Sequence, residues 1–308
     1  MDEAIAEENI PEPEPEKIVD FPLSVELIES NIELLLKSLF GEGYIYTRVN
    51  LNKKKLTDIE ALRSYINLFY VNISKNYLEN INALEEMKFL LTLDASFNRI
   101  TDISLIDSHQ FLSELNLERN QIEVLPIFNI PFLRKLNLNF NKISKLIDDE
   151  GQYCIQGNNI RILEIRNNLL TSTLGINLPW LTFLYLAANQ ITEIHDLLDH
   201  RSLTTLHLRD NKIENLDGLH ESIPFLKYIN LRNNKLSNFD EVKKLISLPE
   251  LEHLVLRENP IEENEEYRIA SLRCIPHLKR LDKAEYEEEE KEQLKTELVP
   301  ENEKELKL

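Results

Sequence analysis

Apolar residues recur in one short pattern, L-x-L-x-x-N-x-L with conservative substitutions, nine times between Val71 and Ile261. Typical copies are L-N-L-E-R-N-Q-I at Leu115 and L-H-L-R-D-N-K-I at Leu206. The alternating apolar positions predict a short strand with one buried face, and the asparagine marks the point where the chain turns away. Because successive asparagines are 21 to 27 residues apart, each copy has room for a strand, a turn and a short return segment.

Such short repeats predict a solenoid, because each coil can bury its apolar face only against its neighbours. The spacing is typical of leucine-rich repeats, so we expect an α/β solenoid with a concave parallel β-sheet, a helical or 3₁₀ convex side and helical caps at both ends. A carboxamide both donates and accepts, so the repeated asparagines are predicted to bond turn backbone that the sheet leaves free. This structural ladder comprises Asn76, Asn98, Asn120, Asn141, Asn168, Asn189, Asn211, Asn234 and Asn259.

The chain outside the repeats changes in composition at both ends, which predicts five segments. They are a disordered acidic tail (1–20), an N-terminal capping helix (21–45), the repeats (46–262), a C-terminal cap (263–283) and an acidic tail (284–308). Ser24 is a suitable N-cap for a helix through Leu39, and Gly41 would end it. The C-terminal tail has few apolar positions, so we expect either a solvated helix or an extended arm that a partner orders.

One step of the repeat is longer than the others. Between Asn141 and Asn168, residues 148–158 interrupt the pattern and include Gly151 and Gly157, which predicts a protruding loop. The loop is either a specificity element for a partner or an insertion on the convex side.

A binding surface is predicted on the concave face, because residues beside the buried strand positions point outward there. Arginine is frequent at these positions in the C-terminal half of the array, together with aromatic residues and histidine. Arginine and tyrosine are common in binding hot spots, so we expect a groove for a partner that carries acidic and apolar residues. Alternatively, Asp210, Glu258 and Glu164 neutralise the arginines and nothing binds. The predicted surface comprises Arg166, Phe183, Tyr185, His207, Arg209, Tyr228, Arg232 and Arg257.

Charge and cysteine content limit the partners and the compartment. The net charge is −19, of which residues 1–20 contribute −7 and residues 282–308 contribute −6. A broad basic face for nucleic acid is therefore not expected. The only two cysteines lie in different coils, which favours a reducing cytoplasm. The acidic, proline-containing start and the lack of a long apolar run lead us to expect neither a signal peptide nor a membrane-spanning segment.

The sequence offers no support for catalysis. It contains no nucleotide-binding, nucleophile-elbow or zinc-protease motif, and we expect neither an enzyme nor a cofactor nor a small-molecule substrate. The cluster His195, Asp196, Asp199 and His200 could suggest a metal site, but it falls in a return segment where polar residues are expected, so no metal is predicted. Trp180 is expected to pack between coils, with an exposed anchor as the alternative.

Longer, non-repeating strings carry a more specific resemblance. They are L-T-D-I-E-A-L-R-S-Y-I-N-L at Leu56, L-T-S-T-L-G-I-N-L-P-W-L at Leu170, L-T-T-L-H-L-R-D-N at Leu203, and L-K-R-L-D-K-A-E-Y-E-E-E-E ending at Glu290. The repeats resemble the short intracellular leucine-rich-repeat class, and these strings are similar to a family of radial spoke components of motile cilia. The resemblance extends from about Pro22 to Glu290.

That resemblance implies a non-enzymatic scaffold of the axonemal radial spoke, near the spoke head, in the cytoplasm and cytoskeleton of a cilium or flagellum. The implied partners are other radial spoke proteins, especially head and neck components. The class as a whole leaves an alternative, a regulatory leucine-rich-repeat subunit of a phosphatase or a dynein.

Overall fold

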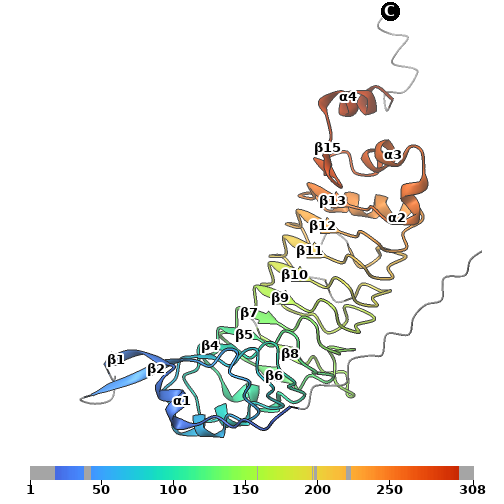
Figure 1. Ribbon diagram of the computed structural model, residues 1–308. Helices are drawn as coiled ribbons and strands as arrows, with labels where there is room; N and C mark the ends of the chain where they lie inside the picture. The colour runs from blue at the N-terminus through green and yellow to red at the C-terminus, as the bar shows by residue number, and fades with distance from the viewer. Residues whose placement is uncertain are drawn as a thin grey trace, which may run out of the picture.

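The computed structural model describes residues 18–37, 43–157, 159–195, 197, 200–219 and 223–297. They form one curved solenoid, and the strands of successive coils lie side by side in one sheet (Figure 1). Because the register keeps buried leucines opposite one another, for example Leu184 against Leu206 and Leu206 against Ile229, each coil stacks directly on the next.

Within the described residues, the main sheet has thirteen strands, and it is parallel except for one antiparallel pair at each end. In order they are β1 (Ile32–Lys37), β2 (Tyr44–Asn50), β3 (Tyr70–Asn72), β4 (Thr92–Asp94), β5 (Glu114–Asn116), β7 (Lys135–Asn137), β9 (Ile162–Glu164), β10 (Phe183–Tyr185), β11 (Thr205–His207), β12 (Tyr228–Asn230), β13 (His253–Val255), β14 (Arg280–Leu281) and β15 (Ala284–Glu285).

The return segments on the convex side are short, and within the described residues most of their regular structure is 3₁₀. These turns are η1 (Glu60–Ser64), η2 (Asn82–Leu84), η3 (Ser104–Ser108), η4 (Leu245–Ser247) and η5 (Pro260–Glu263). One return segment also contains an α-helix, α2 (Phe239–Lys244), which runs directly into η4. Leucines and isoleucines from the strands and returns form one continuous core, as the solenoid prediction requires.

The N-terminal cap differs from the predicted helix. Ser24 does begin a helix, since its Oγ accepts a hydrogen bond from the backbone N–H of Leu27, but α1 covers only Val25–Glu29. The expectation of a helix through Leu39 is wrong, because residues 32–37 form the strand β1. This strand pairs with β2 and so satisfies backbone groups that β2 would otherwise leave unpaired at the sheet edge. Leu35 in this strand is 50% exposed. The predicted end at Gly41 and the predicted disordered segment up to residue 17 lie outside the described residues.

The C-terminal cap uses a helix, α3 (Tyr267–Cys274), followed by the last parallel strand β14. The Oη of Tyr267 donates to the carboxylate of Asp282 at 2.9 Å, which ties the start of the helix to the end of the strand. Beyond β15, the tail is helical over α4 (Glu288–Glu297), and its Leu294 is buried. The described part of this tail is therefore the helical one of the two predicted forms.

The interruption at 148–158 lies on the return side, where β8 (Ile155–Gln156) pairs in parallel with β6 (Phe128–Asn129). The Oδ1 of Asp148 accepts hydrogen bonds from the backbone N–H groups of Glu150 and Gln152, so the exposed tip is a closed turn. Ile155 is buried and anchors the segment to the core. Asn158 lies outside the described residues, and the role of the loop as a specificity element remains a prediction.

Candidate protein-binding surface on the concave face

The nine ladder asparagines are buried, and each bonds backbone groups of its own coil and of the preceding coil. The Nδ2 of Asn189, for example, donates to the carbonyls of Ile165 (2.8 Å) and Leu186 (3.0 Å), and its Oδ1 accepts from the N–H of Leu170 (3.1 Å). These bonds link one coil to the coil before it. The asparagines are therefore part of the frame that positions the concave side chains, and they are not available to a partner.

Four of the predicted surface residues form a continuous stack across neighbouring strands. The guanidinium carbon of Arg166 lies 4.2 Å from the ring centre of Tyr185, which lies 4.9 Å from the ring centre of His207. His207 in turn lies 5.0 Å from Tyr228. The parallel register produces this stack. It pairs Tyr185 with His207, and on the next strand Tyr228 lies two residues before the partner of His207. The four half-buried groups present a continuous row of large planar groups with polar ends, in which neighbouring rings are tilted by 32° and 37°.

Stacking also changes the chemistry of His207. Burial between two tyrosines, together with the positive charge of Arg166, lowers the pKa of His207 to about 4. The ring is therefore neutral near pH 7, and it can donate or accept a hydrogen bond without carrying charge.

The arginines of the surface are paired with acids along the sheet. Arg209 Nε lies 2.7 Å from Asp210, Arg232 bonds Glu258, and Arg166 lies 3.9 Å from Glu164. All three acids of the alternative interpretation are thus found next to arginines. Exposed pairs of this kind contribute about 0–1 kcal/mol, so a partner's carboxylate can compete for the same guanidinium groups.

Two further residues of the predicted surface lie outside the stack. Phe183 starts β10 and is half-buried, and Arg257 is exposed with its Nε 3.4 Å from Glu262.

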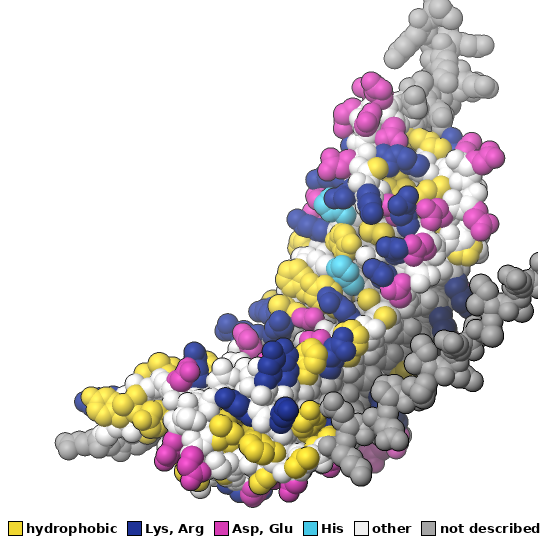
Figure 2. Space-filling model, viewed as in Figure 1, with side chains coloured by type: hydrophobic (Ala, Val, Ile, Leu, Met, Phe, Trp, Pro, Cys, Tyr) yellow, Lys and Arg dark blue, Asp and Glu magenta, His cyan; other side chains and the backbone are white. Residues whose placement is uncertain are grey.

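The Nε of Arg232 is buried and has no hydrogen-bond partner among the described residues. Among the buried side-chain nitrogen and oxygen atoms of the described residues, it is the one without a hydrogen-bond partner. Figure 2 shows basic, acidic and apolar side chains mixed along the visible face of the array.

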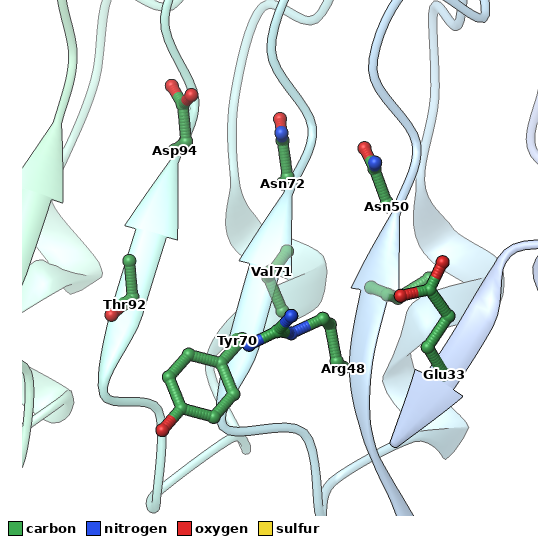
Figure 3. Close-up of a pocket in the computed structure, with 9 residues that line it drawn as sticks. Glu33, Arg48, Asn50, Tyr70, Val71, Asn72, Thr92 and Asp94 are labelled. Carbon is green, nitrogen blue, oxygen red and sulfur yellow. The ribbon is translucent and has the colours of Figure 1, made fainter.

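The sequence interpretation missed a shallow pocket of about 320 Å³ at the N-terminal end of the sheet. Figure 3 shows its lining, with Glu33 on β1 and the Arg48 side chain extending over Tyr70. The guanidinium carbon is 4.9 Å from the ring centre. Asp94 and Asn72 close the far side, so the pocket offers a cation and carboxylates a few strands apart. It depends on the β1–β2 hairpin, which the helix prediction could not anticipate.

Trp180 differs from expectation, and the predicted histidine and aspartate cluster is only partly described by the structure. Trp180 is 51% exposed rather than packed between coils, and the guanidinium carbon of Arg161 is 5.1 Å from its ring centre. His200 is buried, and its Nε2 accepts from the N–H of Leu178. Asp196 and Asp199 lie outside the described residues, and the described part of the chain holds no group of three or more potential metal ligands. Nor does that part contain a helix long and apolar enough to cross a bilayer.

These features define a leucine-rich-repeat protein. A leucine-rich repeat family profile matches residues 170–307, and a second one matches residues 129–146. The functional domain of InlJ from Listeria monocytogenes, which is 19% identical, superimposes with a TM-score of 0.55 over 78% of this chain and 55% of its own, which supports the fold.

Closer relatives identify the family. Leucine-rich repeat-containing protein 23 of Xenopus tropicalis is 47% identical over 88% of this chain and 76% of its own length. The Homo sapiens protein of the same name is 38% identical over 90% of this chain and 80% of its own. The chain belongs to the leucine-rich repeat-containing protein 23 family.

Proposed function

We propose that this chain is a non-enzymatic scaffold of the axonemal radial spoke, near the spoke head, which binds other spoke proteins through its concave face. The family assignment and the non-repeating strings that resemble ciliary spoke components support the location. The observation that supports binding is the stack of Arg166, Tyr185, His207 and Tyr228. Large, rigid groups of this type dominate protein interfaces because they lose little conformational freedom on binding.

The occupant is a segment with acidic and apolar residues. Its apolar side chains cover the stack, and its carboxylates compete with Asp210 and Glu258 for Arg209 and Arg232.

Localisation tests the spoke assignment. Tagged protein should be enriched in axonemes, and deletion should remove density from the radial spokes and impair ciliary motility. A diffuse cytoplasmic pool that co-purifies with a phosphatase or a dynein, with spokes intact, would instead favour a regulatory subunit and reject the scaffold.

A double charge reversal tests the surface. Arg209→Glu with Arg232→Glu should reduce capture of spoke head and neck proteins from axonemal extract by at least about tenfold, since hot-spot residues commonly contribute 2 kcal/mol or more. Lys212→Glu with Lys235→Glu is the matched control, because it changes the net charge equally on exposed lysines that follow the ladder asparagines. Equal capture by both double variants would show that the partner binds elsewhere.

A further inference from the structure

An exposed aromatic row lies outside the concave surface, on the turns that precede strands β4, β5 and β7. The ring centres of Phe89 and Phe111 are 5.9 Å apart, and those of Phe111 and Phe132 are also 5.9 Å apart. Interplanar angles of 24° and 9° make this a nearly parallel stack over three coils. We call Phe89, Phe111 and Phe132 the edge row.

The edge row is not part of the core. Each phenylalanine is followed by a leucine that is fully buried, so the side chain before it points out of the coil. The three rings are 44%, 45% and 54% exposed in chain order. Stacking stabilises the rings against each other, but it leaves their outer faces in water, which is unusual for three adjacent aromatic residues.

Basic residues stand close to the row in the chain: Lys88 precedes Phe89, and Arg134 follows Phe132. Arg134 is exposed, and no acidic side chain in the described part of the chain pairs with it or with Arg161. Lys88, which precedes Phe89, bonds the carbonyl of Glu85 at 3.0 Å, with Glu86 3.9 Å away. A partner that covers the row therefore gains from carrying acidic residues.

The spacing of the row fits a helix that lies across the coils. Residues on one face of an α-helix recur about every 5.4 Å, close to the 5.9 Å step of the rings. Successive apolar residues at i, i+4 and i+7 can thus contact successive phenylalanines. We infer that the edge row is a second docking site, and that its occupant is an amphipathic helix of a partner with an apolar stripe flanked by acids.

A synthetic helix can test this inference without the natural partner. The probe is a lactam-stapled peptide with leucines at i, i+4, i+7 and i+11 and glutamates on both sides, titrated with the full chain and followed by fluorescence anisotropy. Binding should be at least about tenfold weaker to Phe111→Ala than to the wild type, as for a central anchor. Phe225→Ala is the matched control, because Phe225 is 54% exposed in the same I-P-F-L context as Phe132 but lies outside the row.

Two further measurements keep the result interpretable. Arg134→Glu leaves the rings in place, and it should weaken the glutamate peptide while strengthening a lysine-flanked version. The concave variant Arg209→Glu with Arg232→Glu should bind the probe normally, which separates this site from the proposed spoke-binding surface. The inference would be overturned if the wild-type chain did not bind the probe. It would also be overturned if a peptide of the same composition with scattered leucines bound equally well. A dimer that sedimentation velocity detects and Phe111→Ala abolishes would assign the row to a second copy instead.

Discussion

Asn189 illustrates how a single side chain holds the coils together. Its carboxamide bonds the carbonyls of Ile165 and Leu186 and the N–H of Leu170, all of them away from water. Asn189→Ala leaves these groups unsatisfied and should lower the free energy of unfolding by about 1–3 kcal/mol. Urea unfolding followed by circular dichroism measures the loss. Exposed Asn67 provides the control, since Asn67→Ala should change stability by no more than about 0.5 kcal/mol. Equal effects of the two substitutions would contradict a structural ladder.

His207 makes the stability of the protein depend on pH. Its pKa is lowered from 6.5 to about 4, so between these values the unfolded chain binds more protons than the folded one. The stabilising effect of the neutral ring is complete above pH 6.5 and is lost as the pH falls towards 4. Allowing for the part of the ring that contacts water, the contribution is on the order of 1–2 kcal/mol.

Comparison with His207→Phe isolates this contribution, because phenylalanine can keep the stack but cannot titrate. The difference in unfolding free energy between wild type and variant should change between pH 7 and pH 5, in favour of the variant at low pH. A difference that stays constant over this range, or an NMR titration that places the His207 pKa near 6.5, would show that the ring is not desolvated.

At the level of residues, the sequence predicts frame positions better than surface chemistry. The ladder asparagines follow from the repeat because one local rule, a turn after a short strand, applies to every coil. The stack at His207 depends instead on side-chain rotamers and on the pairing of neighbouring coils. Sequence placed Tyr185, His207 and Tyr228 on the same face, but it could not show that their rings touch or that Arg166 covers one end.

Among the elements, the N-terminal hairpin shows where local sequence misleads. Residues 32–37 read I-E-L-L-L-K, which are mainly good helix formers, yet they form β1. The exposed edge of β2 offers unpaired backbone groups, and pairing with that edge outweighs a modest helix preference. The regular strands were predictable because the period-two pattern and the stacking requirement agree there, whereas at the edge they compete.

Close approach of neighbouring return segments gives a prediction for Gly218. A Cβ atom at this position would lie 2.1 Å from the carbonyl oxygen of Ile194 in the preceding coil, so backbone would have to move. Gly218→Ala should therefore cost about 1–3 kcal/mol of stability, as overpacking does elsewhere. Gly43 has no neighbouring atom within 4 Å of the corresponding position, so Gly43→Ala should be close to neutral. Thermal unfolding compares the two, and similar melting temperatures would mean that the coils separate at little cost.

Across the whole molecule, the sequence predicts the solenoid and its concave sheet but not every surface that the solenoid presents. The concave candidates could be read from strand alternation. The edge row was missed, although Phe89, Phe111 and Phe132 stand at the same position of successive repeats, each directly before a buried leucine. The repeat alignment can place these side chains in one row, but the stacking of their rings is visible only in three dimensions.

The C-terminal cap provides a test of this one-dimensional organisation. Tyr286 is 5% exposed, its Oη donates to the carbonyl of Arg268 at 2.8 Å, and the Arg268 guanidinium carbon lies 4.2 Å from its ring centre. Tyr286→Ala removes these contacts at the open end of the sheet and should cost about 3–5 kcal/mol locally, as for other large aromatic truncations. Because each coil contacts only its neighbours, the effect should be greatest nearby and decline along the array.

Amide hydrogen exchange measures this gradient. Protection should fall most in α3 and β14, less in β13, and little in β3 to β5, where the same coils remain stacked. Tyr44→Ala serves as the control, because Tyr44 is 70% exposed at the opposite end and its loss should leave the C-terminal pattern unchanged. A uniform loss of protection across all strands in Tyr286→Ala would mean that the array unfolds as a single cooperative unit. The caps would then stabilise the distant concave surface as much as the adjacent coils.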